Sequence, residues 1–309
     1  MSPDILVAAL LTAMTAATPL LLAALGELVV EKSGVLNLGV EGMMLVGAVA
    51  GFAVGLTTGD WRLGILAAAA AGAALAFVFA VLTLNLMSNQ VATGLALTIF
   101  GIGLSSLIGA GFVGRPVSPI PKLELPGLTD LPVVGPILFG QDPIVYLSFV
   151  AAGAVAWFLT RSRAGMVLRA VGESDVSAHA LGYDVLRIRL YAVLFGGVMA
   201  GLAGGYLSLA YTPLWIEEMT AGRGWIALAI VVFAAWKPWR AVVGAYLFGG
   251  VTILQLYLQG AGVMPVPSQI FSMLPYLATI VALVFISAGP WRARSDAPAC
   301  LGKPFRPAG

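Results

Sequence analysis

Residues 161–189 read RSRAGMVLRAVGESDVSAHALGYDVLRIR, the only dense cluster of charged residues in an otherwise apolar chain. The cluster contains five arginines, Glu173, Asp175, Asp184 and His179, which is the only histidine of the protein. Apolar segments long enough to cross a membrane lie on both sides of it. A long, charged, structured loop between two membrane spans is typical of a protein that uses this loop to contact something soluble.

Composition places the chain in a membrane rather than in water. Of its 309 residues, 60% are hydrophobic and only 10% are charged, and the mean hydropathy is +0.99. Such a chain has too few polar side chains to cover its apolar surface. The formal charge of +2 is too small to indicate binding of nucleic acid. The single cysteine, Cys300, excludes a disulfide framework and a cysteine metal site.

The apolar segments predict an all-α fold, a polytopic bundle of transmembrane helices. A helix needs about 20 mostly apolar residues to cross the hydrocarbon core. We expect residues 1–290 to form this transmembrane domain and the polar tail, residues 291–309, to be disordered. The nine candidate spans are Ile5–Leu25, Leu38–Leu56, Leu63–Leu86, Val91–Val113, Ile144–Leu159, Leu190–Tyr211, Trp225–Trp236, Val242–Leu258 and Ile270–Ser287.

The seventh candidate, Trp225–Trp236, is short, because at 1.5 Å per residue it covers only about 20 Å. It is either extended backward through Glu217–Gly224 or is a half-helix lying against protein. If the segment did not cross, Lys237 and Arg240 would lie on the opposite side of the membrane from residues 161–189.

The distribution of basic residues predicts the orientation. With nine crossings, 12 of the 16 lysines and arginines fall on the side that carries residues 161–189 and the tail. Because cytoplasmic loops carry the excess of basic residues, this side is predicted to be cytosolic and the N-terminus to be outside.

Small residues recur every four positions within several spans. Such stripes let helix backbones approach closely, so we expect them to mark helix packing rather than a solute path. The stripes are Gly47/Gly51/Gly55, Gly101/Ser105/Gly109 and Gly197/Gly201/Gly205.

A short helix is predicted inside the charged loop. Ser174 can cap its N-terminus, Asp175 favours the first turn, and Gly182 is a natural stop. The result is a helix of about two turns, which is too short to be stable alone. The alternative is an ordinary basic loop that only enforces topology.

Glycine-broken backbone beside polar groups indicates a solute path at two places. The first is Gly34–Gly42, where Asn37 and Glu41 stand between two spans; broken helices mark substrate sites in transporters. Alternatively, Glu41 lies at the cytosolic interface and reaches water. The second is Thr220–Trp225, where glycines flank Arg223; the alternative is a turn with an interfacial tryptophan.

Asn89 and Gln90, which open the fourth span, are weaker candidates for the path. Helix capping explains this pair at least as well. We nevertheless include both among the candidate path residues, with Asn37, Glu41 and Arg223.

Several functional classes lack the residues that they need. The chain has no G-x-x-x-x-G-K-[ST] motif, so it cannot cradle ATP phosphates in that way. No Ser/His/Asp or metal-ligand cluster can be assembled inside the spans, which argues against an intramembrane enzyme and predicts no cofactor. Few ionisable residues lie within the spans, which argues against a proton-relay pump.

Taken together, five stretches make the chain resemble permease subunits of bacterial ABC importers in the branched-chain amino acid/ribose permease superfamily. Within it, the chain is most similar to the simple-sugar and nucleoside permeases that depend on basic membrane proteins. The similarity covers nearly the whole chain. The stretches are EKSGVLNLGVEGMM (31–44), NQVATGLALT (89–98), RAVGE (169–173) through Leu181-Gly182, TAGRGWIALA (220–229) and MLPYLAT (273–279).

The resemblance implies a multi-pass protein of the bacterial inner membrane that works within a larger complex. Expected partners are a second homologous permease subunit, cytosolic ATPase subunits, an extracytosolic substrate-binding lipoprotein and membrane lipid, with no nucleic acid. The loop matches the family's ATPase-coupling region, which implies coupling roles for Glu173, Ser174, Asp175, His179, Leu181 and Gly182. ATP hydrolysis would occur on the separate ATPase chains, so this subunit would not be an enzyme.

The resemblance favours a nucleoside or related purine compound as the solute, then a simple sugar, then a branched-chain amino acid. The alternative function is a secondary transporter or channel that is not coupled to an ATPase. Such a protein would have no use for a structured cytosolic helix.

Overall fold

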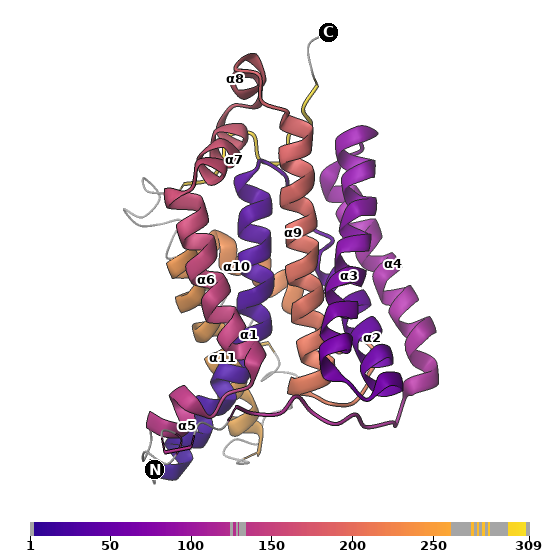
Figure 1. The fold of residues 1–309 in the computed structure, drawn as a ribbon, viewed down its shortest axis with the longest axis vertical. Helices are drawn as coiled ribbons and strands as arrows, with labels where there is room; N and C mark the ends of the chain where they lie inside the picture. Colours follow the sequence, from indigo (N-terminus) through magenta and orange to yellow (C-terminus); the bar gives the residue numbers. More distant parts are fainter. Residues whose placement is uncertain are drawn as a thin grey trace.

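The computed structural model describes residues 3–123, 126–127, 129, 134–260, 273–274, 277, 280–281, 284 and 296–306. Within these ranges the protein is all-α, and one isolated bridge between Pro116 and Leu214 is the only β-type pairing. The long helices run side by side along the molecule, and the short α7 and α8 lie at the end where the chain finishes (Figure 1). The helices are α1 (Pro3–Lys32), α2 (Val40–Thr58), α3 (Trp61–Ala80), α4 (Gln90–Gly109), α5 (Val134–Phe139), α6 (Pro143–Arg161), α7 (Arg163–Glu173), α8 (Asp175–Ala180), α9 (Val185–Tyr206), α10 (Arg223–Phe233) and α11 (Pro238–Gly260).

Seven helices of the described residues are long and apolar enough to cross a membrane, which confirms the predicted polytopic helical bundle. They contain α1, α2, α3, α4, α6, α9 and α11. Short π-helical segments extend α3 to Asn85 and α9 to Tyr211. The predicted ninth span, residues 270–287, lies mostly outside the described residues, so the count of nine spans stays a prediction.

Side-chain caps start most of these helices. Asp142 accepts hydrogen bonds from the backbone N–H groups of Ile144 at 2.9 Å and Val145 at 3.1 Å, and Pro143 occupies the first turn of α6. Such caps satisfy donors that have no partner within the helix. The same role falls to Asp60, Asn89, Ser162, Ser174 and Asp184 at the starts of α3, α4, α7, α8 and α9.

The small-residue stripes bring α2, α3 and α9 into close contact at the centre of the bundle. A Cβ atom on Gly47 would lie 2.6 Å from the Cα atom of Gly201, so any larger residue at position 47 would force the helices apart. Gly101 of α4 packs in the same way on Gly42 of α2. The stripes therefore serve helix packing, as predicted.

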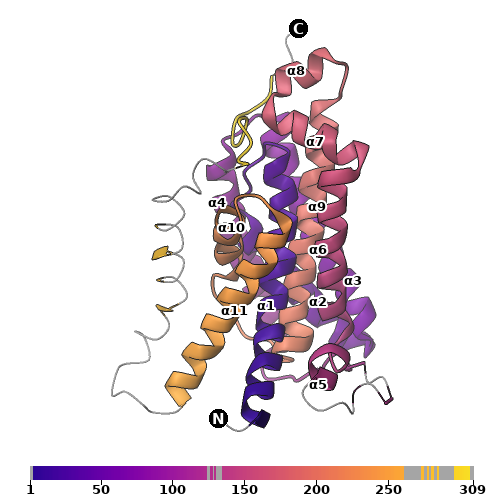
Figure 2. The same cartoon turned by 90° about the vertical axis from the view of Figure 1, so that its left-hand side faces the viewer.

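The short seventh segment is a half-helix. Helix α10 has 11 residues and begins at Arg223, beside Glu41 in the first turn of α2. It ends near Trp236, whose indole N–H donates to Glu31 in the last turn of α1. Residues 212–222 lead the chain from the end of α9 back to this starting point, and α10 stands at mid-height in both views (Figures 1 and 2).

Although α10 is short, Lys237, which follows it, lies at the same end of the molecule as α7 and α8. Lys237 pairs with Asp296 of the tail at 3.6 Å, and the backbone oxygen of Asp296 accepts a hydrogen bond from Lys32 at 2.7 Å. The return segment and the half-helix together thus make one pass through the bundle. Helix α11 then runs back to the end where α1 begins (Figure 2).

The expectation of a disordered tail does not hold for residues 296–306. Cys300 donates its backbone N–H to the oxygen of Gly172 at 2.9 Å, and Gly302 donates to Gly34 at 3.1 Å. Phe305 is buried in a small apolar cluster with Val171 of α7, and Ala178 and Val185 complete the cluster. The polar composition predicts disorder, whereas the backbone oxygens of Gly172 and Gly34 accept hydrogen bonds that order the tail.

Candidate functional site

The carboxylate of Glu41 caps the N-terminus of the half-helix α10. Its Oε1 accepts from the Thr220 hydroxyl at 2.5 Å and the Gly222 N–H at 2.9 Å, and its Oε2 accepts from the Gly224 N–H at 2.5 Å. Glu41 is buried, so it does not reach water as the interfacial alternative required. A negative group at this position is stabilised by the positive end of the helix dipole.

Two glycines make this arrangement possible. Gly222 has φ 79°, a left-handed conformation that glycine adopts without strain. A Cβ atom on Gly224 would lie 2.6 Å from the Cα atom of Glu41, so only glycine lets the two backbones approach this closely. The predicted break before the short span is therefore a site where α10 begins against α2.

Asn37 shapes the loop between α1 and α2. Its side-chain oxygen accepts from the Gly39 N–H at 2.9 Å, and its own N–H donates to Oε1 of Glu27 at 3.1 Å. Both side chains are buried. This loop places Glu41 at the first turn of α2, so Asn37 supports the capped half-helix indirectly.

Gln90 contacts the same loop from α4. Its Oε1 accepts from the Leu36 N–H at 2.8 Å, and its buried Nε2 has no hydrogen-bond partner among the described residues. Asn89, by contrast, is exposed and accepts from the Ala92 N–H at 3.0 Å as the cap of α4. The structure thus gathers Asn37, Glu41 and Gln90 around residues 36–41, and it gives Asn89 the capping role.

Arg223 lies at the other face of the α10 N-terminus. Its Nη1 donates to the backbone oxygens of Met219 at 3.1 Å and Thr220 at 3.2 Å. Its guanidinium carbon lies 5.2 Å from the centre of the Tyr211 ring, within the range of a cation–π contact. These contacts hold the return segment, residues 212–222, in place.

Sequence reasoning missed two buried carboxylates of α1. Glu31 and Lys32 lie beyond the predicted first span, Ile5–Leu25, but they belong to the end of α1 and are 2% and 8% exposed. Glu31 accepts from the indole N–H of Trp236 at 2.5 Å, and Glu27 accepts from Asn37 as described above. The spacing of Glu27 and Glu31, one helical turn apart at the end of an apolar segment, was the available signal.

The predicted short helix exists as α8. Ser174 caps it by accepting from the Ser177 N–H at 3.3 Å, and Gly182 ends the turn that follows with φ 86°. At its tip, Val176 is 69% exposed and Leu181 is 78% exposed. Glu173, the last residue of α7, is also exposed. These residues form a small apolar tip with charged neighbours at the end of the molecule.

Arg189 fixes α8 to the rest of the protein. Its guanidinium group is fully buried and donates to Oδ2 of Asp175 at 3.0 Å. It also donates to the backbone oxygens of Ser33 at 3.1 Å and Lys303 at 3.4 Å. One side chain therefore joins α9, α8, the loop after α1 and the tail.

The ring of His179 packs against Phe305 of the tail. Its ring and that of Phe305 meet edge to face, with 5.4 Å between their centres. This ring contact and the hydrogen bonds of Arg189 to Asp175 and Lys303 pack the tail against α8.

Comparison with known proteins identifies the family. Residues 9–283 match the model described as the branched-chain amino acid transport system permease component. The chain belongs to this family. It is 45% identical over 307 residues to a putative glucose ABC transporter permease protein, TsgC13, of Haloferax volcanii, and the match covers 93% of each chain. It is 32% identical to the guanosine ABC transporter permease protein NupQ of Bacillus subtilis, covering 94% of this chain and 93% of that one. It is also 32% identical to the nucleoside ABC transporter permease protein NupC of Lactococcus lactis, covering 86% and 88%.

Membership in the family establishes what kind of protein this is. The chain is the membrane-embedded permease subunit of an ABC importer, and ATP hydrolysis takes place on a separate subunit. It is a transport subunit rather than an enzyme, and the alternative of a transporter without an ATPase is set aside.

Proposed function

We propose that this permease imports an uncharged solute built around a sugar ring, either a nucleoside or a simple sugar. The observation that carries the proposal is the cap on α10. In transporters with broken helices, the positive N-terminus of a half-helix often binds an anionic group of the substrate. Here Glu41 occupies that position with three hydrogen bonds.

The same observation argues against an amino acid. A solute carboxylate would have to displace Glu41 or approach it closely, and two like charges near each other in a low-dielectric site repel strongly. A neutral polyhydroxylated solute avoids this repulsion. The names of the relatives agree, because those quoted above are named for glucose, guanosine and nucleosides. The family description, by contrast, mentions branched-chain amino acids.

For the solute path we propose the region around the start of α10. Gln90 has a buried, unpartnered Nε2 donor there, and Arg223 is only half-buried. Asn37 and Glu41 form hydrogen bonds to other residues of the chain. We therefore assign them to maintaining the shape of the path rather than to binding the solute. Asn89 is the least favoured of the predicted path residues, because it is an exposed cap.

We further propose that α8 and its flanks, residues 173–182, dock onto the ATPase. The exposed apolar side chains of Val176 and Leu181 can be buried in a groove of the ATPase. Glu173, Ser174, Asp175, His179 and Gly182 shape and orient this tip. Because Arg189 ties the tip to α9 and to the loop after α1, a movement of the ATPase would be passed to the spans as a rigid shift.

The proposed orientation has the N-terminus outside and both α8 and the tail in the cytosol. The distribution of basic residues supports it, and the side chains of Lys32 and Lys237 both contact Asp296 of the tail at the α8 end. In this arrangement a second permease subunit completes the path, and an extracytosolic binding lipoprotein delivers the solute.

Competition for uptake tests the solute class. Cells that express the permease with its ATPase and binding protein should take up labelled guanosine or labelled glucose in a saturable manner. A hundredfold excess of unlabelled leucine should leave this uptake unchanged. Saturable uptake of leucine, with no uptake of either sugar-containing solute, would overturn the proposal.

A further inference from the structure

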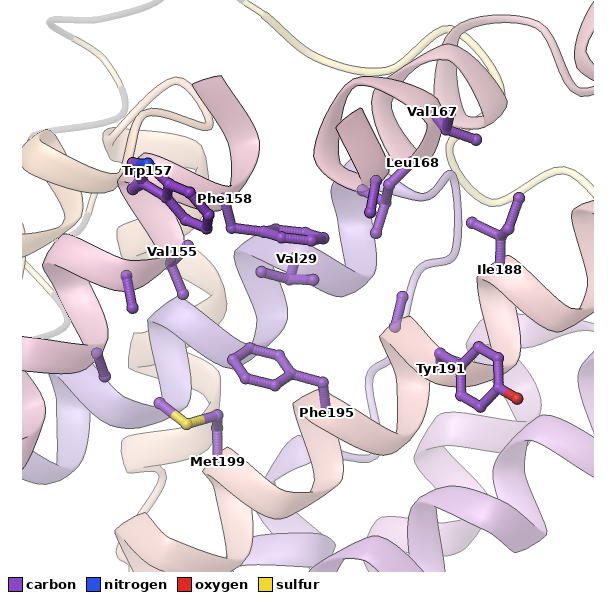
Figure 3. A pocket seen from close by; sticks show the side chains of 14 residues that line it. Val29, Val155, Trp157, Phe158, Val167, Leu168, Ile188, Tyr191, Phe195 and Met199 are labelled. Carbon is purple, nitrogen blue, oxygen red and sulfur yellow. The ribbon is translucent and has the colours of Figure 1, made fainter. Parts of the chain in front are cut away.

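An apolar cavity opens between α6 and α9. Both helices pack on α1, but they diverge from each other, and α7 crosses above the gap (Figure 1). The cavity has a volume of about 600 Å³, within the range of roughly 300–1,000 Å³ typical of small-molecule sites. Val29 of α1 forms its back wall, Phe158 and Leu168 belong to α6 and α7, and Phe195 and Met199 belong to α9 (Figure 3).

The lining excludes a polar ligand. It consists of aliphatic and aromatic side chains, and only Tyr191 and Trp157 carry a polar side-chain atom. The hydroxyl of Tyr191 points away from the cavity in Figure 3. A hydroxylated solute would lose its hydrogen bonds to water there and find none in return. The cavity therefore suits a hydrocarbon chain and is separate from the proposed solute path.

Basic and aromatic residues border the cavity at its α7 end. Arg161 follows Trp157 by four residues on α6, and Arg163 comes directly before the lining residue Ala164. Both arginines are exposed, and neither forms an ion pair within the described residues. Trp157 is 63% exposed and Tyr191 is 68% exposed. Exposed aromatic residues beside basic ones are typical of the headgroup region of a membrane.

We propose that this cavity is a binding site for an anionic phospholipid. One acyl chain fills the space between α6 and α9, and the phosphate group lies at Arg161 and Arg163. The charge of the two arginines selects an anionic headgroup over a zwitterionic one. Because the bound lipid would pack beneath α7, it would support the base of α8. The proposal requires only that the spans lie in a membrane, and it is independent of the solute.

Lipid binding can be measured directly by native mass spectrometry of the purified permease complex. The protein is titrated with phosphatidylglycerol or with phosphatidylcholine of the same acyl chains. Wild type should bind one phosphatidylglycerol with higher affinity than phosphatidylcholine. Each arginine should contribute about a fivefold difference in affinity. The double variant Arg161→Gln/Arg163→Gln should bind both lipids equally. Equal binding of the two lipids by wild type would overturn the proposal.

Matched variants separate the cavity from the general membrane surface. Ala154→Trp places a large side chain in the cavity from an exposed position, and it should remove the retained lipid. Gly153→Trp, at a position where an added Cβ atom meets nothing within 4 Å, and Arg62→Gln at the other end should bind lipid as wild type does. If Ala154→Trp keeps its lipid but loses its pairing with the second permease, the cavity is a protein interface and the proposal fails.

Discussion

Arg189 of α9 and Asp175 of α8 form a buried ion pair, with 3.0 Å between Nη2 and Oδ2. The arginine side chain is fully buried and that of Asp175 is 12% exposed. The pair joins the exposed helix at the end of the molecule to a helix in the centre of the bundle. Arg187, two residues earlier, pairs with Asp184 at 2.9 Å, but its side chain is 77% exposed.

The contrast between these two pairs gives the first prediction. Arg189→Ala should lower stability by about 3–5 kcal/mol, because it leaves the Asp175 carboxylate buried without its partner. Arg187→Ala should cost no more than about 1 kcal/mol, since exposed ion pairs contribute little. Thermal unfolding of the purified proteins in detergent measures both effects. Equal melting temperatures for the two variants would contradict the anchoring role of Arg189.

The second prediction concerns Glu41. Glu41→Ala should strongly reduce solute uptake, because three donors at the start of α10 lose their acceptor at about 1–3 kcal/mol each. Glu41→Gln should retain intermediate uptake, since an amide oxygen can still accept from some of these donors. Glu217→Ala, in the exposed part of the return segment, is the control. Uptake in Glu41→Ala equal to that of the control would show that the cap is dispensable.

The third prediction uses Cys300, the only cysteine, as a reporter of the packed tail. Cys300 is 9% exposed and should react slowly with a membrane-permeable maleimide. Phe305→Ala should accelerate the reaction by about tenfold for each 1.4 kcal/mol of lost packing. Arg306→Ala changes an exposed neighbour and should leave the rate unchanged. A wild-type rate as fast as that in urea would mean that the tail does not pack in solution.

Hydropathy and the pattern of helix caps were sufficient to predict the long apolar helices, the polytopic bundle and the short helix α8, but not α5 or α7. Ser174 and Gly182 are local signals, because each acts on backbone groups within four residues. The partner of Glu41 was not predictable in this way. It lies about 180 residues further along the chain, and only the packing of α10 on α2 brings the two together.

The order of the tail, like the partner of Glu41, could not be predicted from local sequence. Its polar, proline-containing composition is typical of disorder, and nothing local opposes that interpretation. Its order depends on Gly34, Gly172 and Arg189, which offer backbone and guanidinium partners only once the helices have assembled. Likewise, the charges of Glu31 and Lys32 suggest contact with water, whereas here Glu31 accepts from the buried Trp236 and Lys32 donates to the backbone oxygen of Asp296.

The fourth prediction concerns the orientation. In a Cys300→Ser background, a cysteine introduced at the exposed Ser177 of α8 should react with an impermeant maleimide in inside-out vesicles only. A cysteine introduced at Thr58, the exposed last residue of α2, should react in intact cells. Labelling of the Ser177→Cys protein in intact cells would reverse the proposed topology.

The most direct measurement is solute-stimulated ATP hydrolysis by the reconstituted complex carrying Ala178→Pro. Proline removes the N–H that donates to the Ser174 oxygen at 3.0 Å and should disrupt α8, whereas Ala178→Ser retains this donor and serves as the control. We expect Ala178→Pro to abolish both stimulation and uptake, while the binding protein still binds its solute. Normal stimulation in a folded Ala178→Pro complex would contradict the claim that residues 173–182 couple the permease to its ATPase.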